Sequence, residues 1–288
     1  MLKEPSMKIT GNVRHRLVCS DNDTGKLVWI NEEGCVDRVL SDLHNCFDFW
    51  ALPGGEVLYA HFGKHSPAGF TVVDESGAVL RTYETQHEVF GLQPLPDGNV
   101  LVGELGQKRL VEVDPEGKIV KEIPIFYGGK QHECMRAVRK SGGIYYVVMP
   151  GTNEVRRYDE EGRALKAFSI RPDAFGVVAL ENGGIAYTCM QGLFELDAEG
   201  KEIFSLTDAD LPGINLRWLL GLQRLRNGNY VLANWMGHGH LDEGIHFFEV
   251  DRNKQVIWTL DGRGTLRTPA ALQILDAEEG DVSNPPVR

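Results

Sequence analysis

Long apolar runs, basic charge and paired cysteines are scarce in this sequence, and each shortage excludes a class of protein. No stretch of the 288 residues approaches the ~20 consecutive apolar residues of a membrane-spanning helix, so no membrane partner is expected. The net charge of -11, without a basic stripe, argues against a nucleic-acid partner. The five cysteines are scattered without metal-type pair spacing, which predicts reduced and mostly buried thiols.

Two further shortages concern localisation and chemistry. Reduced cysteines suit a reducing compartment, so we expect a cytoplasmic protein. The alternative is export, because residues 1–10 lack the apolar core of a secretory signal but a cleaved signal would leave no trace. The sequence also has no Gly-x-Ser-x-Gly elbow, phosphate-binding loop or dinucleotide fingerprint. Nucleophilic serine chemistry and nucleotide chemistry therefore have no support from local motifs.

A four-residue segment recurs six times in one register. Its first and third columns are apolar or small, while polar residues recur in the second and fourth. The first five segments run into a tight turn such as Leu-Pro-Asp-Gly-Asn at 95–99, and a later Asp-x-x-Gly turn closes each repeat. The segments are 47–50, 90–93, 135–138, 175–178, 220–223 and 270–273, and the second turns lie at 74–77, 114–117, 159–162 and 197–200, with variants at 31–34 and 251–254.

Four short strands recurring about every forty residues predict a blade of a β-propeller, and six second turns imply six blades. The chain starts with a second strand near 16–19 and ends with a first strand near 270–275. We therefore expect the C-terminal strand to complete the N-terminal blade, which removes two sheet edges at once. A β-sandwich or open β-solenoid is the alternative, but neither explains the matched missing strands. The prediction is one all-β domain over 1–288, with a propeller core at 14–275 and a flexible tail at 276–288.

The position three residues before each segment predicts a functional ring. It holds histidine three times and arginine twice, at the face that also carries the longer loops and eight of the nine histidines. The residues at this position are His44, His87, His132, Pro172, Arg217 and Arg267. We predict that His87 and His132 act as general acid or base. The predicted substrate-binding residues are His44, Arg136, Arg217, Arg267, Glu104 and Trp235.

Two arrangements of these side chains follow from the register. The histidines and the arginines at 217 and 267 should share one cavity, with Asp48, Gln93, Arg136, Gln223 and Gln273 below them along the channel. The turn at 139–143 carries one extra residue, and a slip of one there would turn Arg136 away from the channel. The alternative interpretation is a polar channel mouth that binds water.

The function that we expect is a site for an anionic or sugar-like small molecule, used by an enzyme with histidine acid–base chemistry. The alternative is a non-catalytic propeller that binds a ligand or a protein partner on the same face. No metal site is assigned, although three in-phase histidines with a carboxylate could bind a divalent metal if their nitrogens converge. We expect a monomer that needs no cofactor.

Residues 87–99 and 221–229 resemble repeats of the PQQ-like propeller superfamily. The chain is similar to six-bladed bacterial propeller proteins and, more distantly, to arylsulfotransferases. That resemblance implies the fold and a site at the channel mouth. Arylsulfotransferases use histidines and an arginine at that place, and the residues of this chain that resemble them are His44, His87, His132 and Arg136. The histidines stand further ahead of the Leu-Pro-x-Gly turn than in that family, so only the location is carried over. Quinoprotein dehydrogenases have eight blades, so a PQQ cofactor is not implied.

Overall fold

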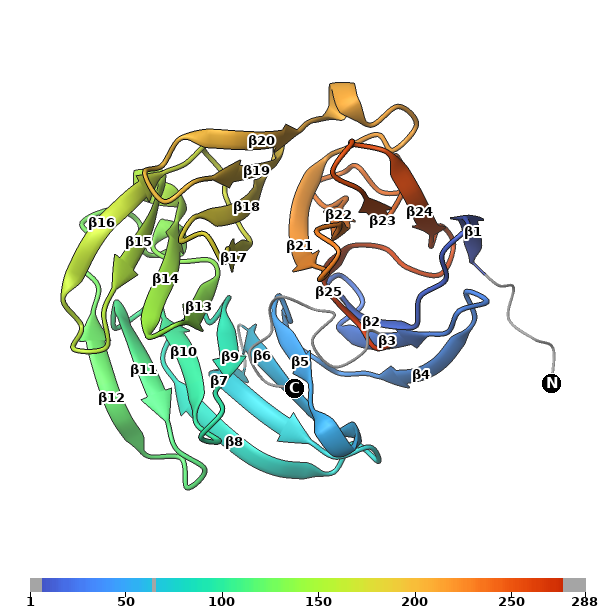
Figure 1. Cartoon of the computed structure of the whole chain (residues 1–288). Coiled ribbons are helices and arrows are strands. Elements are labelled where there is room, and N and C mark those ends of the chain that lie inside the picture. Colours follow the sequence, from blue (N-terminus) through green and yellow to red (C-terminus); the bar gives the residue numbers. More distant parts are fainter. Residues whose placement is uncertain (1–6, 64–65, 277–288) are drawn as a thin grey trace.

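Six antiparallel sheets form a ring around a central axis (Figure 1). The structure is a computed structural model that describes residues 7–63 and 66–276. Its described residues form strands and four short 3₁₀ turns, η1 (Pro53–Gly55), η2 (Gln131–Glu133), η3 (Pro150–Thr152) and η4 (Asp208–Asp210). The predicted six-bladed propeller is confirmed. The predicted tail lies outside the described residues, apart from Asp276.

Each blade has four strands, which are named here from the innermost to the outermost. Blade 1 contains β25 (Pro269–Ile274), β2 (Leu17–Asp21), β3 (Lys26–Ile30) and β4 (Val36–Leu40). Blade 2 contains β5 (Phe49–Ala51), β6 (Val57–Gly63), β7 (Ser66–Val73) and β8 (Val79–Thr85). Blade 3 contains β9 (Leu92–Pro94), β10 (Val100–Glu104), β11 (Arg109–Val113) and β12 (Ile119–Pro124).

The second half of the ring repeats this plan, with one addition at its end. Blade 4 contains β13 (Val138–Ser141), β14 (Ile144–Met149), β15 (Glu154–Tyr158) and β16 (Ala164–Ser169). Blade 5 contains β17 (Val177–Ala179), β18 (Ile185–Cys189), β19 (Gly192–Leu196) and β20 (Glu202–Leu206). Blade 6 contains β21 (Trp218–Arg224), β22 (Tyr230–Trp235), β23 (Phe247–Val250) and β24 (Val256–Asp261), and β1 (Lys8–Gly11) pairs with β24 as a fifth strand.

The ring is closed from both ends of the chain. Strand β25 pairs antiparallel with β2, so the C-terminal strand supplies the innermost strand of the N-terminal blade, as predicted. Strand β1 adds a second closure that the sequence did not predict, because it covers the outer edge of β24. Its four residues are mostly exposed and show no apolar alternation. Both closures cover strand edges that would otherwise be free to pair with other chains.

Local turn chemistry positions the outer strands. In blade 2, the Asp74 carboxylate accepts the backbone N–H groups of Ser76 and Ala78 at 2.8 and 2.9 Å, and Gly77 takes a φ of 88°. The side chain at the first turn position accepts the N–H four residues later in the other five blades as well, at Asn31, Asp114, Asp159, Asp197 and Asp251. The Asp-x-x-Gly motif therefore predicted these turns for the right physical reason.

Neighbouring blades are joined by the fourth column of the repeat. Gln273 of blade 1 accepts from the Ala51 N–H at 2.8 Å and donates to the Ala51 carbonyl at 3.3 Å in blade 2. Gln93 binds both backbone groups of Lys140 in blade 4 in the same way, at 2.6 and 3.1 Å. Gln223 accepts from the Ile274 N–H at 2.8 Å, which joins blade 6 to blade 1. Each amide thus satisfies backbone groups of the next inner strand, much as a paired strand would.

The register of blade 4 is shifted by one residue from the predicted alignment. Val138 pairs with Val147, and the Val148 N–H donates to the Ala137 carbonyl, as the Gly103 N–H does to Gly91 in blade 3. Ala137 therefore occupies the position predicted for Arg136. The expected extra residue in the following turn is not there, because only four residues lie between the paired Lys140 and Tyr145, against five between Pro94 and Val100 in blade 3. The prediction that Arg136 lies along the channel is wrong, and Arg139 lies there instead.

Apolar side chains fill the spaces between blades. Trp50, Leu58 and Phe70 of blade 2 pack in one buried cluster with Leu92 and Val102 of blade 3. The third column of the repeat is buried at Phe49, Leu92, Ala137 and Val177, as predicted, whereas Leu222 and Leu272 are half-buried and line the channel.

Candidate active site at the channel mouth

Four phenylalanine rings close the channel on the loop-rich face. Phe47, Phe90 and Phe175 stand at the first column of the repeat, and Phe62 comes from the end of β6. The centroids of Phe62 and Phe90 are 4.9 Å apart, and Phe47 lies 5.1 Å from Phe90 and 5.9 Å from Phe175. We call these four rings the aromatic floor.

Below the floor, the channel is nearly filled around a buried ion pair. The Arg139 guanidinium donates to the Asp48 carboxylate at 2.8 Å, and the Leu92 N–H donates to the same carboxylate at 3.1 Å. Burial raises the pKa of Asp48, and Arg139 opposes that shift. Asp48 and Arg139 line two cavities of only about 40 Å³ each, and Gln223 and Gln273 line one of them. The channel interior is therefore structural.

An imidazole and a guanidinium meet above one ring of the floor. His132 contacts Phe90 edge to face at 5.3 Å between ring centroids, and the Arg136 guanidinium lies 4.4 Å from the centre of the same ring. The Arg136 guanidinium also donates to the His132 backbone carbonyl. His132 Nδ1 lies 2.9 and 3.1 Å from the two carboxylate oxygens of Glu88. A carboxylate in this position fixes the tautomer and orientation of an imidazole.

Arg136 is a buried cation that has no direct ion-pair partner among the residues that the structure describes. The residue is only 9% exposed, and its guanidinium donates to the carbonyl oxygens of His132 and Met135. Within the described part of the chain, Glu88, Glu133 and Asp173 act on it from beyond ion-pair distance. Burial lowers the pKa of Arg136 to about 10, against the pull of these carboxylates. A desolvated guanidinium of this kind favours an anionic ligand.

His87 lies beside the same carboxylate, at the edge of a larger cavity. His87, Glu88, Asn45 and Phe62 are among the residues that line a cavity of about 650 Å³, a volume typical of small-molecule sites. The backbone of His87 has a φ of 69°, which is uncommon for a residue with a side chain. Its ring packs against Gly106, where a Cβ atom would come within 2.1 Å of the imidazole. Glu88 therefore links the cavity to His132.

The two ring arginines at 217 and 267 are engaged elsewhere. Arg217 forms an ion pair with Glu243 at 2.7 Å, and Glu243 also binds His240 at 2.9 Å. The backbone N–H of Arg267 donates to Asp21 at 3.1 Å, and its guanidinium lies 3.8 Å from Asp23. The predicted ring is thus divided into separate groups instead of lining one cavity.

The remaining predicted binding residues have other neighbours. Glu104 is fully buried and accepts the Tyr83 hydroxyl at 2.7 Å and the Arg109 guanidinium, so it joins blades 2 and 3. Trp235 packs edge to face against Trp218 and His238, with centroids 5.7 and 4.9 Å away. His44 is exposed, and its backbone carbonyl accepts the Phe62 N–H at 2.9 Å.

The sequence interpretation missed Glu88, Phe90 and Asp173 as parts of this site. Glu88 and His132 are 44 residues apart, which is about one repeat, so the repeat period brings them to neighbouring blades. Asp173 lies within electrostatic range of Arg136, and its carbonyl accepts the Trp218 indole N–H at 3.0 Å. The period could have indicated the Glu88–His132 pair, but the contact of Asp173 depends on loop conformation.

Other features bear on metals, thiols and membranes. Among residues 7–63 and 66–276, no three His, Cys, Asp or Glu side chains are arranged to hold a metal ion. All five cysteines are free, and all except Cys35 are buried. No helix in the part of the chain that the structure describes is long and apolar enough to cross a membrane.

Comparison with known proteins supports the architecture. The chain matches no family model and no curated protein. It is similar to a solved structure of a protein of unknown function from Bacteroides caccae, with 21% identity and a TM-score of 0.80 over 92% of this chain and 100% of that one. It is also similar to a catalytically inactive histidine-to-alanine variant of virginiamycin B lyase from Staphylococcus aureus, solved with quinupristin, with 13% identity and a TM-score of 0.63 over 96% and 98% of the two chains. At these identities the likeness shows the propeller fold alone, and it does not support the narrower PQQ-like or arylsulfotransferase resemblance.

Proposed function

We propose that the loop-rich face is an enzyme site for a small anionic molecule, with His132 as the general acid–base. The observation that carries this proposal is the meeting of His132 and Arg136 at the single ring of Phe90, with Glu88 bound to His132. The three groups supply an oriented imidazole, the carboxylate that orients it and a cation for the ligand. Phe90, which contacts both His132 and Arg136, belongs to the core of the propeller.

The roles follow from the contacts. Glu88 accepts a hydrogen bond from the Nδ1–H group of His132. Nε2 is then available to take a proton from the ligand or return it. The His132 side chain is 60% exposed, so Nε2 is accessible from the loop-rich face. Arg136 holds the anionic group close to the imidazole. The cavity beside His87 and Glu88 accommodates the rest of the molecule, and His87 is a second titratable group there.

The similar lyase structure supports the choice of an enzyme. A histidine-to-alanine change leaves virginiamycin B lyase catalytically inactive, so a propeller of this shape can depend on one imidazole. The low identity carries no residue assignment to this chain. Quinupristin is nevertheless a reasonable member of a substrate panel, beside lactones, sugar conjugates and aryl sulfates.

The test is turnover of that panel by wild type and three variants. We expect His132→Gln to lower kcat by about 10²–10⁴-fold, the usual contribution of a general acid–base. Arg136→Gln should lower kcat/KM chiefly for substrates with an anionic group. The matched control is His240→Gln, because His240 forms an exposed pair with Glu243 at 2.9 Å but lies apart from Phe90 and Arg136.

The outcomes separate catalysis from binding alone. Equal turnover by wild type and His132→Gln would overturn the acid–base assignment. An anion that binds in an Arg136-dependent manner without any turnover would instead support the non-catalytic ligand-binding propeller. Unchanged ligand affinity in Arg136→Gln would remove Arg136 from the site.

A further inference from the structure

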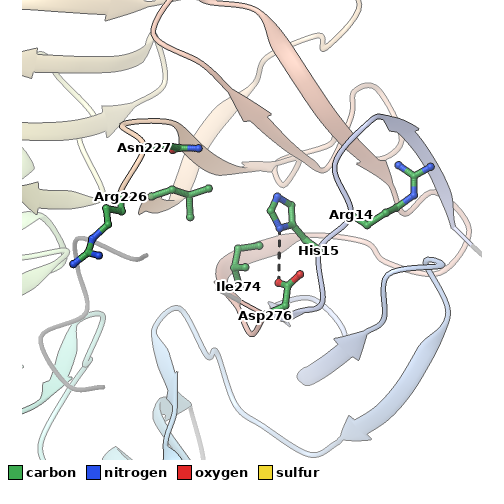
Figure 2. A pocket seen from close by; sticks show the side chains of 7 residues that line it. Arg14, His15, Arg226, Asn227, Ile274 and Asp276 are labelled. Atoms are coloured by element: carbon green, nitrogen blue, oxygen red, sulfur yellow. Dashed lines mark ion pairs between the residues drawn. The ribbon is translucent and has the colours of Figure 1, made fainter. Parts of the chain in front are cut away.

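Another cavity lies at the seam between blade 6 and blade 1, on the face of the short turns (Figure 2). Its volume is about 260 Å³, and its lining comes from the turn after β21, the end of β25 and the segment before β2. The residues that line it are Arg14, His15, Leu225, Arg226, Asn227, Ile274 and Asp276. It is separate from the channel mouth and from the residues of the proposed active site.

Two other seams show how the repeat fills the corresponding space. Glu112 of blade 3 accepts the Tyr145 hydroxyl and pairs with Lys140 of blade 4 at 2.8 Å. In blade 5, Glu195 accepts the Tyr230 hydroxyl of blade 6 and pairs with Arg252. Each glutamate stands two residues before the Asp of the second turn. At both seams a phenol and a basic side chain therefore cover a buried carboxylate.

The closing seam departs from this pattern. Glu249 has the same place in the repeat and is 2% exposed. In blade 4, Lys140 of the innermost strand pairs with Tyr145 of the second strand. In blade 1, Ile274 takes the place of Lys140 and Leu17 that of Tyr145, and these two residues pair in the same way. Both replacements are apolar, so the basic side chain of the repeat is missing. Among the described residues, His15 makes the only ion pair with Glu249.

His15 is held with one nitrogen facing the cavity. The residue is 7% exposed, and its Nε2 lies 2.7 Å from Glu249, which also accepts from the Asn229 amide at 2.7 Å. Trp258 contacts the ring edge to face at 5.0 Å. Because the carboxylate accepts, Nε2 donates its proton, and Nδ1 can accept a hydrogen bond when it carries no proton of its own. Asp276 Oδ1 lies 3.8 Å from Nδ1, which is too far for a hydrogen bond.

We infer that this cavity binds a small primary amine, whose ammonium lies between His15 Nδ1 and Asp276. An ammonium nitrogen placed between the two acceptors can lie about 2.8 Å from both Nδ1 and Asp276, as charge-assisted hydrogen bonds require. The two carboxylates flanking His15 favour a cation, while Leu225 and Ile274 contact its alkyl part. Arg14 is held by the carbonyls of Gly11 and Val13, and Figure 2 shows Arg14 and Arg226 directed away from the imidazole.

The test is calorimetric titration of the full chain with n-propylammonium chloride. Sodium propionate, an anion of similar size, and sodium chloride at equal ionic strength serve as ligand controls. We expect binding of the amine alone. Asp276→Asn should weaken it by about tenfold or more, since a charge-assisted hydrogen bond is lost. Glu33→Gln, which removes an exposed charge elsewhere, should bind as wild type does.

A second variant restores the repeat. Ile274→Lys places a lysine at the position that Lys140 occupies in blade 4, so it should fill the cavity, raise the melting temperature and abolish amine binding. Ile274→Leu, which keeps the site apolar at this position, should still bind the amine. Absence of amine binding to wild type, binding of propionate, or equal affinity in Asp276→Asn would each overturn the inference. If Ile274→Lys fails to fold, the Asp276→Asn comparison decides the question.

Discussion

At the scale of single residues, burial decides which histidines and acids behave unusually. His246 is fully buried, and its Nδ1 accepts the Gly262 N–H at 3.2 Å. Burial lowers the pKa of His246, although Asp261, Asp242 and Asp21 oppose the shift. Its role is therefore to stay uncharged within the core of blade 6.

This lowered pKa predicts a loss of stability in mild acid. Because the folded pKa lies below the unfolded value of about 6.5, the unfolded chain takes up the proton first as the pH falls. The contribution of His246 is therefore complete above about pH 6.5 and declines below it. We expect His246→Gln to lose less stability than wild type between neutral pH and mild acid, whatever its absolute stability. Urea unfolding at both pH values measures this, and identical losses would contradict it.

At the scale of the strands, the recurring glutamines are structural parts of the ring. Their amides bind the backbone of the next inner strand at three seams, and the Trp50 indole donates to the Leu92 carbonyl at 2.9 Å at a fourth. The repeat had suggested polar residues lining a functional channel. Their buried position and their bonds to the backbone of the next blade show that they close gaps between blades.

Removal of one such amide should weaken the seam measurably. Gln273→Leu leaves the Ala51 N–H and carbonyl without these partners, so we expect the free energy of unfolding to fall by about 1–3 kcal/mol. Gln255→Leu, at an exposed position on the outside of blade 6, should change it little. Denaturant unfolding of both variants is the measurement. Equal stability of the two would show that the seam bonds contribute nothing net.

At the scale of the whole molecule, the two closures are unequal. Strand β25 is an innermost strand with buried residues and bonds to two neighbouring blades, whereas β1 is a short outer strand. The C-terminal closure therefore holds the ring, and the N-terminal strand protects one edge. Figure 1 shows β25 on the inside of the ring and β1 on its periphery.

Truncations should separate these contributions. Deletion from Pro269 onward exposes two sheet edges and should cause unfolding or aggregation. Deletion of residues 1–11 should leave a soluble propeller with a lower melting temperature, at about 2–4 °C per kcal/mol lost. Thermal melting and size-exclusion chromatography check both variants. A C-terminal truncation that melts like the full chain, or an N-terminal truncation that fails to fold, would contradict this ranking.

By itself, the sequence determined the number of blades, their turns and the closure by the C-terminal strand. These features depend on local chemistry, such as the carboxylate of Asp74 capping its own turn, and on a period that repeats along the chain. Tertiary structure alone decided the rest. The shifted register of β13, which is followed by a turn one residue shorter than that after β9, placed Arg139 in the channel and Arg136 at the mouth. Loop conformation divided the predicted ring, bringing His132 to Glu88 and Arg217 to Glu243, because contacts between loops depend on where the blades place them and not on spacing within one repeat.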